Sequence, residues 1–574
     1  MKRHLGTAFA LLCGFAISLT AQEKWSLEAP ASVKWSRVIL GGTYLFSTDK
    51  GLHAIDTESG KLLWTRADLG KLLEFNIEEV PGIPLLFIAE NSSRFSNNST
   101  LVAINLETGE DVWKTEKMKG VLIDLVGNRA ENMVVAMSCE FAGNKVPVRY
   151  MGFDMATGQV KFEGAIKDKA DLYINEKSGK FAPRVDLDGH AQPAFEDGAM
   201  YLAYAGLHKI DTKTGAVLWS APFDVTESHY KRTNSTPVID GDLVYSSAKG
   251  IVRAFDKTSG VLKWTSADFG AAIPEILVRN HLVIARMGGT YFDSSKREFE
   301  LKKPLGIVAL DAASGQLKWR YDGAKESTTN MVYDAQSSTV MIADARSLVG
   351  LKADAAGGAK EAFRVPLEFK AKSGGGKKAA KMAGKFALGG VRAMARKDNS
   401  DEDFPLALVP RQNGTVVVRA KQHLLSFKPA TREIAWGVEY KAPGLPGWQK
   451  LATTAAFAMA YYMNTGTALN TQLGTSTNTT ANNLRQDNIP GMFGAWSKRF
   501  SAANATFNYA YMLTDVEMDN KAAPGIVGVN LDSGETEQEV VFNDREPDYV
   551  VDELRGIVVR THKSGKQIVA SSLR

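Results

Sequence analysis

Apolar and polar residues alternate along most of the chain in short runs, and these runs repeat. The stretch Leu52–Trp64, LHAIDTESGKLLW, is followed by LVAINLETGEDVW, LHKIDTKTGAVLW, VRAFDKTSGVLKW and IVALDAASGQLKW. In the first copy Leu52, Ala54 and Asp56 lie on one face of an extended segment, which is the period-two pattern of a β-strand. Each copy therefore predicts a strand, a tight turn and a returning strand.

The copies share an acidic or amide residue with a glycine four positions later. The side-chain oxygen can accept hydrogen bonds from backbone N–H groups two residues on, and the glycine supplies the positive φ of a tight turn. The predicted turn residues are Asp56, Gly60, Asn105, Gly109, Asp154, Gly158, Asp211, Gly215, Asp256, Gly260, Asp311 and Gly315. These glycines are 49, 49, 57, 45 and 55 residues apart, and weaker copies occur near Lys352, Lys428 and Asn530. Such a period is typical of propellers and solenoids.

A second hairpin precedes the repeated one, as in Pro237–Tyr245, so each repeat contains four strands. A large ring recurs at the start of the returning strand, where it can cover the edge of the next sheet. The predicted blade-docking residues are Trp64, Trp113, Phe162, Trp219, Trp264, Trp319 and Trp436, with Phe363 in a weaker copy. A ring of sheets buries the faces that one sheet cannot. The predicted fold class is all-β, a single propeller of four-stranded blades, with about eight to ten blades.

The two ends of the chain look like parts of one blade. Residues Tyr549–Arg574 read as three strands without the returning strand, and Lys24–Leu27 reads as that missing strand. We expect the N-terminal and C-terminal strands to pair and close the ring.

Two insertions interrupt the repeats, at about 370–403 and 445–500. The segment 370–397 carries nine Lys and Arg residues and no acid, which suits a solvated loop or contact with an anionic partner. Residues 451–484 contain no charged residue. Three interpretations of this segment are open: a degenerate blade, an insertion packed on the ring, or a docking surface.

The first residues are typical of an export signal. A basic start is followed by an apolar run of about 15 residues, too short to span a bilayer. A lipid-modified cysteine normally follows a small residue, but Cys13 follows Leu12, which argues against lipidation. We expect a signal peptide at 1–21, the propeller at 22–574, no transmembrane span, and a periplasmic or secreted location.

Composition narrows the function classes. The chain is 44% apolar and 23% charged, as in globular proteins, and its net charge of +5 gives no support for nucleic-acid binding. Cleavage of the signal would leave Cys139 as the single cysteine, which excludes an intrachain disulfide and a Cys-x-x-Cys-His haem motif.

Candidate chemistry is sparse. The segment Asp186–His190 hints at a calcium loop, but Ala191 and Asp197 stand at the sixth and twelfth positions, where an EF-hand needs Gly and Glu. His53 and His208 occupy one repeat position and are interpreted as strand residues. We therefore predict no catalytic residues and no metal site.

The segment Ala54–Trp64 resembles the repeat Ala-x-Asp-x-x-Thr-Gly-x-x-x-Trp of the PQQ-like, quinoprotein alcohol dehydrogenase-like β-propellers, and comparable segments cover most of the chain. One branch of that family binds pyrroloquinoline quinone and Ca²⁺ and oxidises alcohols or sugars. The BamB-like branch is non-catalytic and belongs to the machinery that assembles outer-membrane barrels. The adjacent cysteine pair of the alcohol dehydrogenases is missing here.

Two hypotheses follow from this resemblance. The first is an exported, non-catalytic scaffold in the cell envelope that binds envelope proteins and needs no cofactor. The alternative is a periplasmic dehydrogenase that uses pyrroloquinoline quinone and Ca²⁺ at an atypical site.

Overall fold

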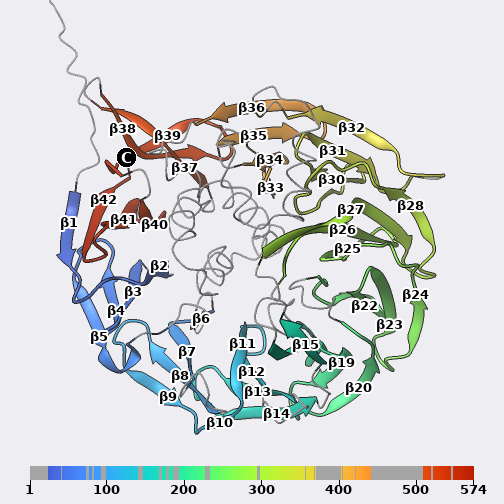
Figure 1. Cartoon of the computed structure of the whole chain (residues 1–574), viewed down its shortest axis with the longest axis horizontal. Coiled ribbons are helices and arrows are strands. Elements are labelled where there is room, and N and C mark those ends of the chain that lie inside the picture. The colour runs from blue at the N-terminus through green and yellow to red at the C-terminus, as the bar shows by residue number, and fades with distance from the viewer. Residues whose placement is uncertain are drawn as a thin grey trace, which may run out of the picture.

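The repeats form a ring of radial β-sheets in the computed structural model (Figure 1). The structure describes residues 23–573 apart from 40–41, 71, 73–76, 81–82, 92–97, 140–146, 167–170, 176–179, 185–192, 226–232, 294–297, 356, 368, 370–402, 404, 421, 441–507, 519–520 and 545–546. Within this part of the chain, ten sheets form the blades of the propeller, which is within the range of about eight to ten that the sequence predicted.

The first five blades are antiparallel meanders that follow the chain order. Blade 1 contains β2 (Trp35–Ile39), β3 (Thr43–Thr48), β4 (Gly51–Asp56) and β5 (Leu62–Arg66). Blade 2 contains β6 (Ile77–Glu79), β7 (Leu85–Asn91), β8 (Asn98–Asn105) and β9 (Asp111–Lys114), with β10 (Met118–Lys119) also paired to β8. Blade 3 contains β11 (Val121–Asn128), β12 (Met133–Cys139), β13 (Val148–Asp154) and β14 (Val160–Ile166). Blade 4 contains β17 (Ala194–Glu196), β18 (Ala199–Ala203), β19 (Gly206–Asp211) and β20 (Val217–Pro222). Blade 5 contains β21 (Val238–Asp240), β22 (Leu243–Ala248), β23 (Ile251–Asp256) and β24 (Leu262–Thr265).

The remaining blades repeat this plan. Blade 6 contains β25 (Glu275–Arg279), β26 (Leu282–Asp293), β27 (Glu298–Asp311) and β28 (Leu317–Tyr321). Blade 7 contains β29 (Val332–Asp334), β30 (Thr339–Ala343), β31 (Ser347–Lys352) and β32 (Glu361–Pro366). Blade 8 contains β33 (Ala407–Pro410), β34 (Val416–Arg419), β35 (His423–Lys428) and β36 (Glu433–Glu439). Blade 9 has three described strands, β37 (Tyr509–Met518), β38 (Lys521–Asn530) and β39 (Thr536–Val541). Blade 10 contains β40 (Asp548–Asp552), β41 (Ile557–Thr561), β42 (Gln567–Ser572) and β1 (Glu23–Glu28).

The two ends of the described chain share blade 10. Strand β1 pairs antiparallel with β42, which is the pairing that the sequence predicted. Blade 10 also contacts blade 1 directly, because Trp25 donates from its indole N–H to the Thr57 carbonyl at 2.8 Å and Thr57 donates from Oγ1 to Asp552 at 2.6 Å. The second of these bonds joins residues 495 positions apart in the sequence.

Each blade presents its connections on two opposite faces of the ring. The strands run alternately up and down from the centre outward, so the first and third connections of a blade lie on one face. We call this the turn face, and it carries the repeated Asp-x-x-x-Gly turns. The second connection of each blade and the link to the next blade lie on the other face, which we call the insertion face.

The core lies between neighbouring blades. Leu45 and Ala54 of blade 1 pack with Leu86 and Val102 of blade 2, and all four side chains are fully buried. Strand residues alternate between the two neighbouring junctions, since successive side chains point to opposite faces of a sheet. Each blade thus supplies half of two separate cores.

The structure also places the weaker copies. Lys352, Lys428 and Asn530 each end the strand next to the outermost one, in blades 7, 8 and 9. The indole N–H of Trp436 in blade 8 donates to the Asp532 carbonyl in blade 9 at 3.1 Å. Blades 8 and 9 are therefore direct neighbours, so the alternative of a hidden blade between them is wrong.

Several predicted segments lie outside the described residues, namely the signal peptide 1–21, Asp186–His190, and all but a few residues of the insertions at 370–403 and 445–500. Two elements were not predicted. One is a hairpin between blades 3 and 4, formed by β15 (Asp171–Asn175) and β16 (Lys180–Arg184), and the other is a 3₁₀ turn, η1 (Ala67–Leu69). No helix among the described residues is long and apolar enough to cross a membrane.

Candidate functional site

The predicted aromatic residues are spread around the ring, one at each of several blade junctions. The six tryptophan indoles each donate a hydrogen bond to a backbone carbonyl of the next blade, at 2.8 to 3.1 Å, with the pairs Trp64 to Leu106, Trp113 to Met155, Trp219 to Lys257, Trp264 to Ala312, Trp319 to Ala353 and Trp436 to Asp532. Trp25 makes the same contact from β1. The side chains of Phe162 and Phe363 have no N–H to donate, and at the first of these junctions Tyr150 donates instead to the Gly215 carbonyl at 3.0 Å.

The turn glycines lie directly against these indoles. Gly315 has a φ of +71°, and a Cβ added there would lie 2.4 Å from Cε3 of Trp264. Glycine is thus needed for two reasons, since the backbone adopts a left-handed conformation and the ring leaves no room for a side chain. The same contact recurs at Gly60, Gly109, Gly158, Gly260 and Gly534, whereas at Gly215 the close atoms are the backbone of Glu163.

The turn carboxylates are occupied by their own turns. Asp311 accepts hydrogen bonds from the backbone N–H of Ala313 and from the N–H and hydroxyl of Ser314. The Ser314 hydroxyl, Lys318 and the Ser314 N–H lower the pKa of Asp311 to about 2. Burial would raise the pKa of Asp56, but hydrogen bonds from Ser59 and Arg555 lower it to about 2. Asp154, Asp211 and Asp256 accept equivalent bonds, as do the amide oxygens of Asn105 and Asn530. These residues cap turns and do not converge on one site.

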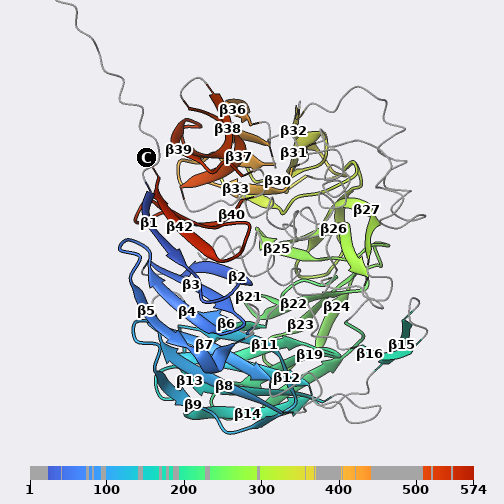
Figure 2. The ribbon, with the colours of Figure 1, turned by 60° about the vertical axis from the view of Figure 1, so that its left-hand side comes forward.

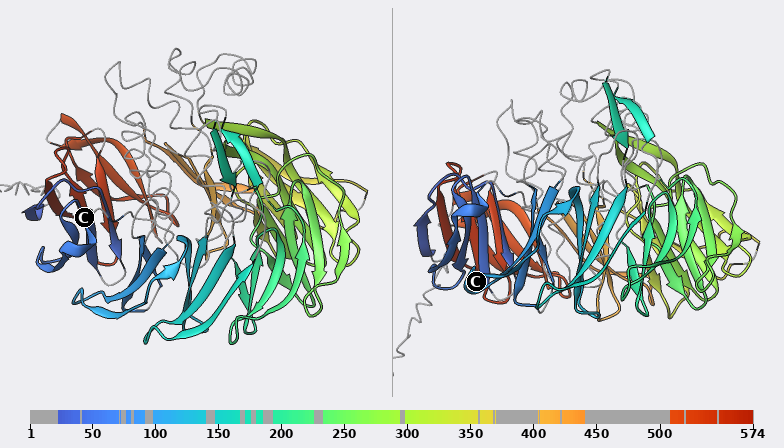
Figure 3. Two further views of the ribbon diagram at one scale, coloured as in Figure 1. Left: turned by 60° about the horizontal axis from the view of Figure 1, so that its bottom comes forward. Right: turned by 90° about the horizontal axis from the view of Figure 1, so that it is seen from below.

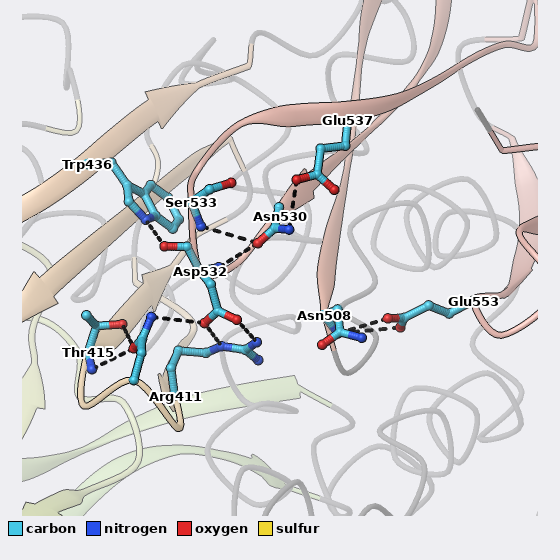
Figure 4. Close-up of polar contacts among 10 residues, drawn as sticks. Arg411, Thr415, Trp436, Asn508, Asn530, Asp532, Ser533, Glu537 and Glu553 are labelled. Carbon is cyan, nitrogen blue, oxygen red and sulfur yellow. Dashed lines mark hydrogen bonds and ion pairs between the residues drawn. The ribbon is translucent and has the colours of Figure 1, made fainter.

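The turn face also carries ion pairs between blades. In Figure 4, Arg411 of blade 8 forms two hydrogen bonds to the carboxylate of Asp532 in blade 9, at 2.8 and 2.9 Å. Asn413 adds a third bond to that carboxylate, and the hydrogen bonds from Arg411 lower the pKa of Asp532. Arg555 of blade 10 forms a hydrogen bond to the carboxylate of Asp56 in blade 1, at 2.7 Å. In both pairs, an arginine in the first connection of one blade binds the aspartate in the outermost turn of the next blade.

The histidines singled out by the sequence are internal. His53 in β4 is buried between the hydroxyls of Thr48 and Thr65, at 3.0 and 3.1 Å, and burial lowers its pKa. His208 in β19 lies between Ser220 and the Tyr204 carbonyl. Both side chains satisfy strand contacts, as the sequence interpretation held.

The insertion face differs because the chain projects from it. Figure 3 shows the β15–β16 hairpin standing clear of the ring on one side. Strands β26 and β27 contain 12 and 14 residues, roughly twice the length of the equivalent strands in blade 5. Figure 2 also shows the β15–β16 hairpin clear of the blades, and strands β37 and β38 of blade 9 are long as well, with ten residues each.

A polar cluster at blade 8 marks the base of the first insertion. Phe369, the last described residue before 370–402, stacks on His423 with ring centroids 4.6 Å apart. Asp403, the first residue after that segment, accepts hydrogen bonds from Nδ1 of His423 and from the Gln422 N–H, both at 2.8 Å. Glu439 lies 3.8 Å from the other ring nitrogen. His423 thus holds both ends of the insertion.

A buried ion pair lies on the same face at blade 6. Nε of Arg286 donates to Glu275 at 2.8 Å, and both side chains are at most 1% exposed. Burial raises the pKa of Glu275, an effect that Arg286 and the Met331 N–H oppose. The second carboxylate oxygen accepts from Met331 in blade 7 at 3.1 Å, so this pair joins two blades.

Sequence reasoning missed the pairs at His423 and Arg286. The signal for Arg286 was present, because Asn280 and His281 form a two-residue turn with positive φ and thereby fix which residues face each other across the hairpin. The signal for His423 was not local, since Phe369 and Asp403 reach it from the connection between two blades.

The described residues contain no group of three His, Cys, Asp or Glu side chains suited to a metal. Glu275, the most buried carboxylate at the ring centre side of blade 6, is already bound by Arg286 and Met331. The described residues therefore offer no cluster of such side chains for the Ca²⁺ of the dehydrogenase branch.

Radial four-stranded sheets, the Asp-x-x-x-Gly turns and the indoles at the junctions define a PQQ-like β-propeller. The sequence profile of the family described as outer membrane protein assembly factor BamB matches residues 16–172 and 168–364, which is more than half of the chain. The chain belongs to this family, and the resemblance seen in the sequence is confirmed.

Individual proteins are more distant. Tetrathionate hydrolase from Acidithiobacillus ferrooxidans is 26% identical over 218 residues, which span 38% of this chain and 40% of that protein. BamB from Moraxella catarrhalis is 14% identical, with a TM-score of 0.34, over 71% of this chain and 97% of that one. A europium-containing methanol dehydrogenase is 10% identical, with a TM-score of 0.32, over 73% and 80% of the two chains.

Proposed function

We propose that the protein is an exported, non-catalytic propeller that binds protein partners in the cell envelope through its insertion face. Membership of the BamB family is the observation that carries this proposal. Two features support it. The repeated polar residues are engaged in turns and junctions, and the projecting hairpins and the base of the basic insertion share one face.

A pair of variants tests which face binds. In one variant, a short Gly-Ser linker replaces residues 171–184, which removes the β15–β16 hairpin. The control is Leu554→Ser on the turn face, where Leu554 is 87% exposed. Purified proteins are crosslinked to an envelope extract of the source cells, and the captured partners are compared by mass spectrometry. We expect the linker variant to lose partners that the control retains. Equal capture by both variants, or loss only in the control, would contradict the proposal.

The basic segment 370–397 is proposed to strengthen this binding by contact with an anionic partner. The described residues that flank the insertion, Phe369 and Asp403, both contact His423 on the insertion face. Raising the salt concentration from 50 to about 500 mM should weaken such contacts, because screening shortens the range of charge interactions. Binding that is insensitive to salt would contradict a role for this segment.

The location is tested separately. Cell fractionation and N-terminal sequencing of the mature protein should find it outside the cytoplasm and shortened near residue 21. A cytoplasmic protein with an intact N-terminus would exclude an envelope role.

The match to tetrathionate hydrolase favours one enzymatic alternative, hydrolysis of tetrathionate. Incubation of the purified protein with tetrathionate, with detection of sulfate and thiosulfate, tests it. The dehydrogenase alternative is tested by adding pyrroloquinoline quinone and Ca²⁺ and measuring a bound chromophore and dye reduction with alcohols or sugars. Turnover in either assay would replace the scaffold proposal.

A further inference from the structure

Two arginines occupy the same position of the repeat, in blades 6 and 8. Arg286 faces Glu275 across β25 and β26, and Arg419 faces Ala407 across β33 and β34. The two arginines are at equivalent positions. In both blades the register shift between the third and fourth strands falls at the same place, at Ala309 in blade 6 and at Ser426 in blade 8. Blade 6 thus supplies a carboxylate where blade 8 supplies a methyl group.

Arg419 is buried without that carboxylate. Its side chain is on the face of β34 that packs toward blade 9, as Val417 does two residues earlier. The residue is only 6% exposed, and its Nε is fully buried with no hydrogen-bond partner in the described part of the chain. Burial lowers the pKa of Arg419 to about 10, so the guanidinium still carries its charge at neutral pH.

A buried guanidinium nitrogen without a partner is unfavourable, because it loses its hydration and gains no hydrogen bond. The planar fork of its N–H groups matches a carboxylate or another oxyanion. Tyr549 of blade 10 lies near enough to interact electrostatically with Arg419. Arg419, Ala407 and Tyr549 are all under 9% exposed, so the partner that we infer for Arg419 must be small.

We propose that Arg419 binds a small oxyanion at the junction between blades 8 and 9, in the place that the Glu275 carboxylate takes in blade 6. The bound ion completes the ion pair and joins the two blades. This site is independent of the partner-binding role of the insertion face.

Thermal unfolding of the full exported protein tests the site. Formate is the main probe, with acetate, sulfate and phosphate beside it, each compared with chloride at the same ionic strength. Sulfate and phosphate also stabilise proteins by exclusion from their surface, so a specific effect must depend on Arg419. We expect formate to raise the unfolding midpoint saturably in the wild type, and Arg419→Met to bind it at least about tenfold more weakly.

Ala407→Glu provides the decisive variant, because it places a carboxylate where blade 6 has one. We expect it to raise the midpoint in chloride and to abolish the increment caused by formate. Glu275→Ala is the matched control, and formate should partly restore its midpoint by filling the vacated position. A wild type that responds equally to formate and chloride, or an increment that persists in Arg419→Met, would overturn the proposal. A response to sulfate and phosphate without one to formate would assign the site to tetrahedral ions instead of carboxylates.

Discussion

The turn face and the insertion face are built from the same blades, yet they are constrained differently. On the turn face, an Asp or Asn cap, a glycine of positive φ and an indole recur, and each is held by a bond to its own turn or to the next blade. On the insertion face, connections range from a two-residue turn at Lys249 and Gly250, between β22 and β23, to the projecting β15–β16 hairpin. Repetition on the turn face supplies the rigidity that lets the other face vary.

The largest effect should come from removing an indole. Trp264 is 7% exposed and donates to the Ala312 carbonyl at 2.9 Å. Trp264→Ala should lower the free energy of unfolding by about 3–5 kcal/mol, because a large aromatic side chain leaves a cavity between two blades. Urea unfolding followed by circular dichroism measures this.

Trp264→Phe is the matched control, since Phe162 and Phe363 occur naturally at this position of the repeat. It should cost about 1 kcal/mol, near the net value of the lost hydrogen bond. If alanine and phenylalanine destabilise equally, the ring does not act as the packing element that we infer.

A smaller effect is expected at the turn glycine. Gly315→Ala meets both a positive φ and the Trp264 ring, so we expect a loss of about 2–4 kcal/mol. Gly357→Ala is the control, because Gly357 also has a positive φ of 75° but has no atom within 4 Å of the added Cβ. It should cost only about 1–2 kcal/mol. Equal losses in the two variants would show that the indole yields easily and does not constrain the turn.

The smallest effect concerns the charge of the turn cap. The pKa of Asp311 is lowered from 3.8 to about 2 in the folded protein, so its stabilising contribution is complete above its ordinary pKa and is lost as the pH falls toward 2. Asp311→Asn should remove this acid-dependent contribution while keeping the turn, since Asn105 accepts the same backbone N–H bonds. Unfolding measured from pH 5 to 2.5 should show a shallower pH dependence in the variant, with a difference below about 1 kcal/mol. A variant as acid-sensitive as the wild type would mean that the charge does not matter.

The sequence predicted the turn face well because its signals are local. Asp56 and Gly60 are four residues apart, so the turn, its cap and the following strand can be identified without knowing the rest of the fold. The count of about eight to ten blades had the same basis, and ten are found in the described residues. The weak copies misled only where spacing was used alone, between blades 8 and 9.

The insertion face could not be predicted in this way. His423 contacts Phe369 and Asp403, which come from a connection between blades, and nothing in the sequence near His423 indicates them. Similarly, the sequence around Arg419 does not show that Ala407 faces it, because that depends on the register of β33 and β34.

By itself, the sequence determined the repeating unit, because strand alternation, turn chemistry and the indole position are written within about a dozen neighbouring residues. The tertiary structure alone decided which side chains share a junction and whether a buried charge finds a partner. Those outcomes follow from the packing of separate blades, where residues far apart in the chain must fill one enclosed space and satisfy each other's hydrogen bonds.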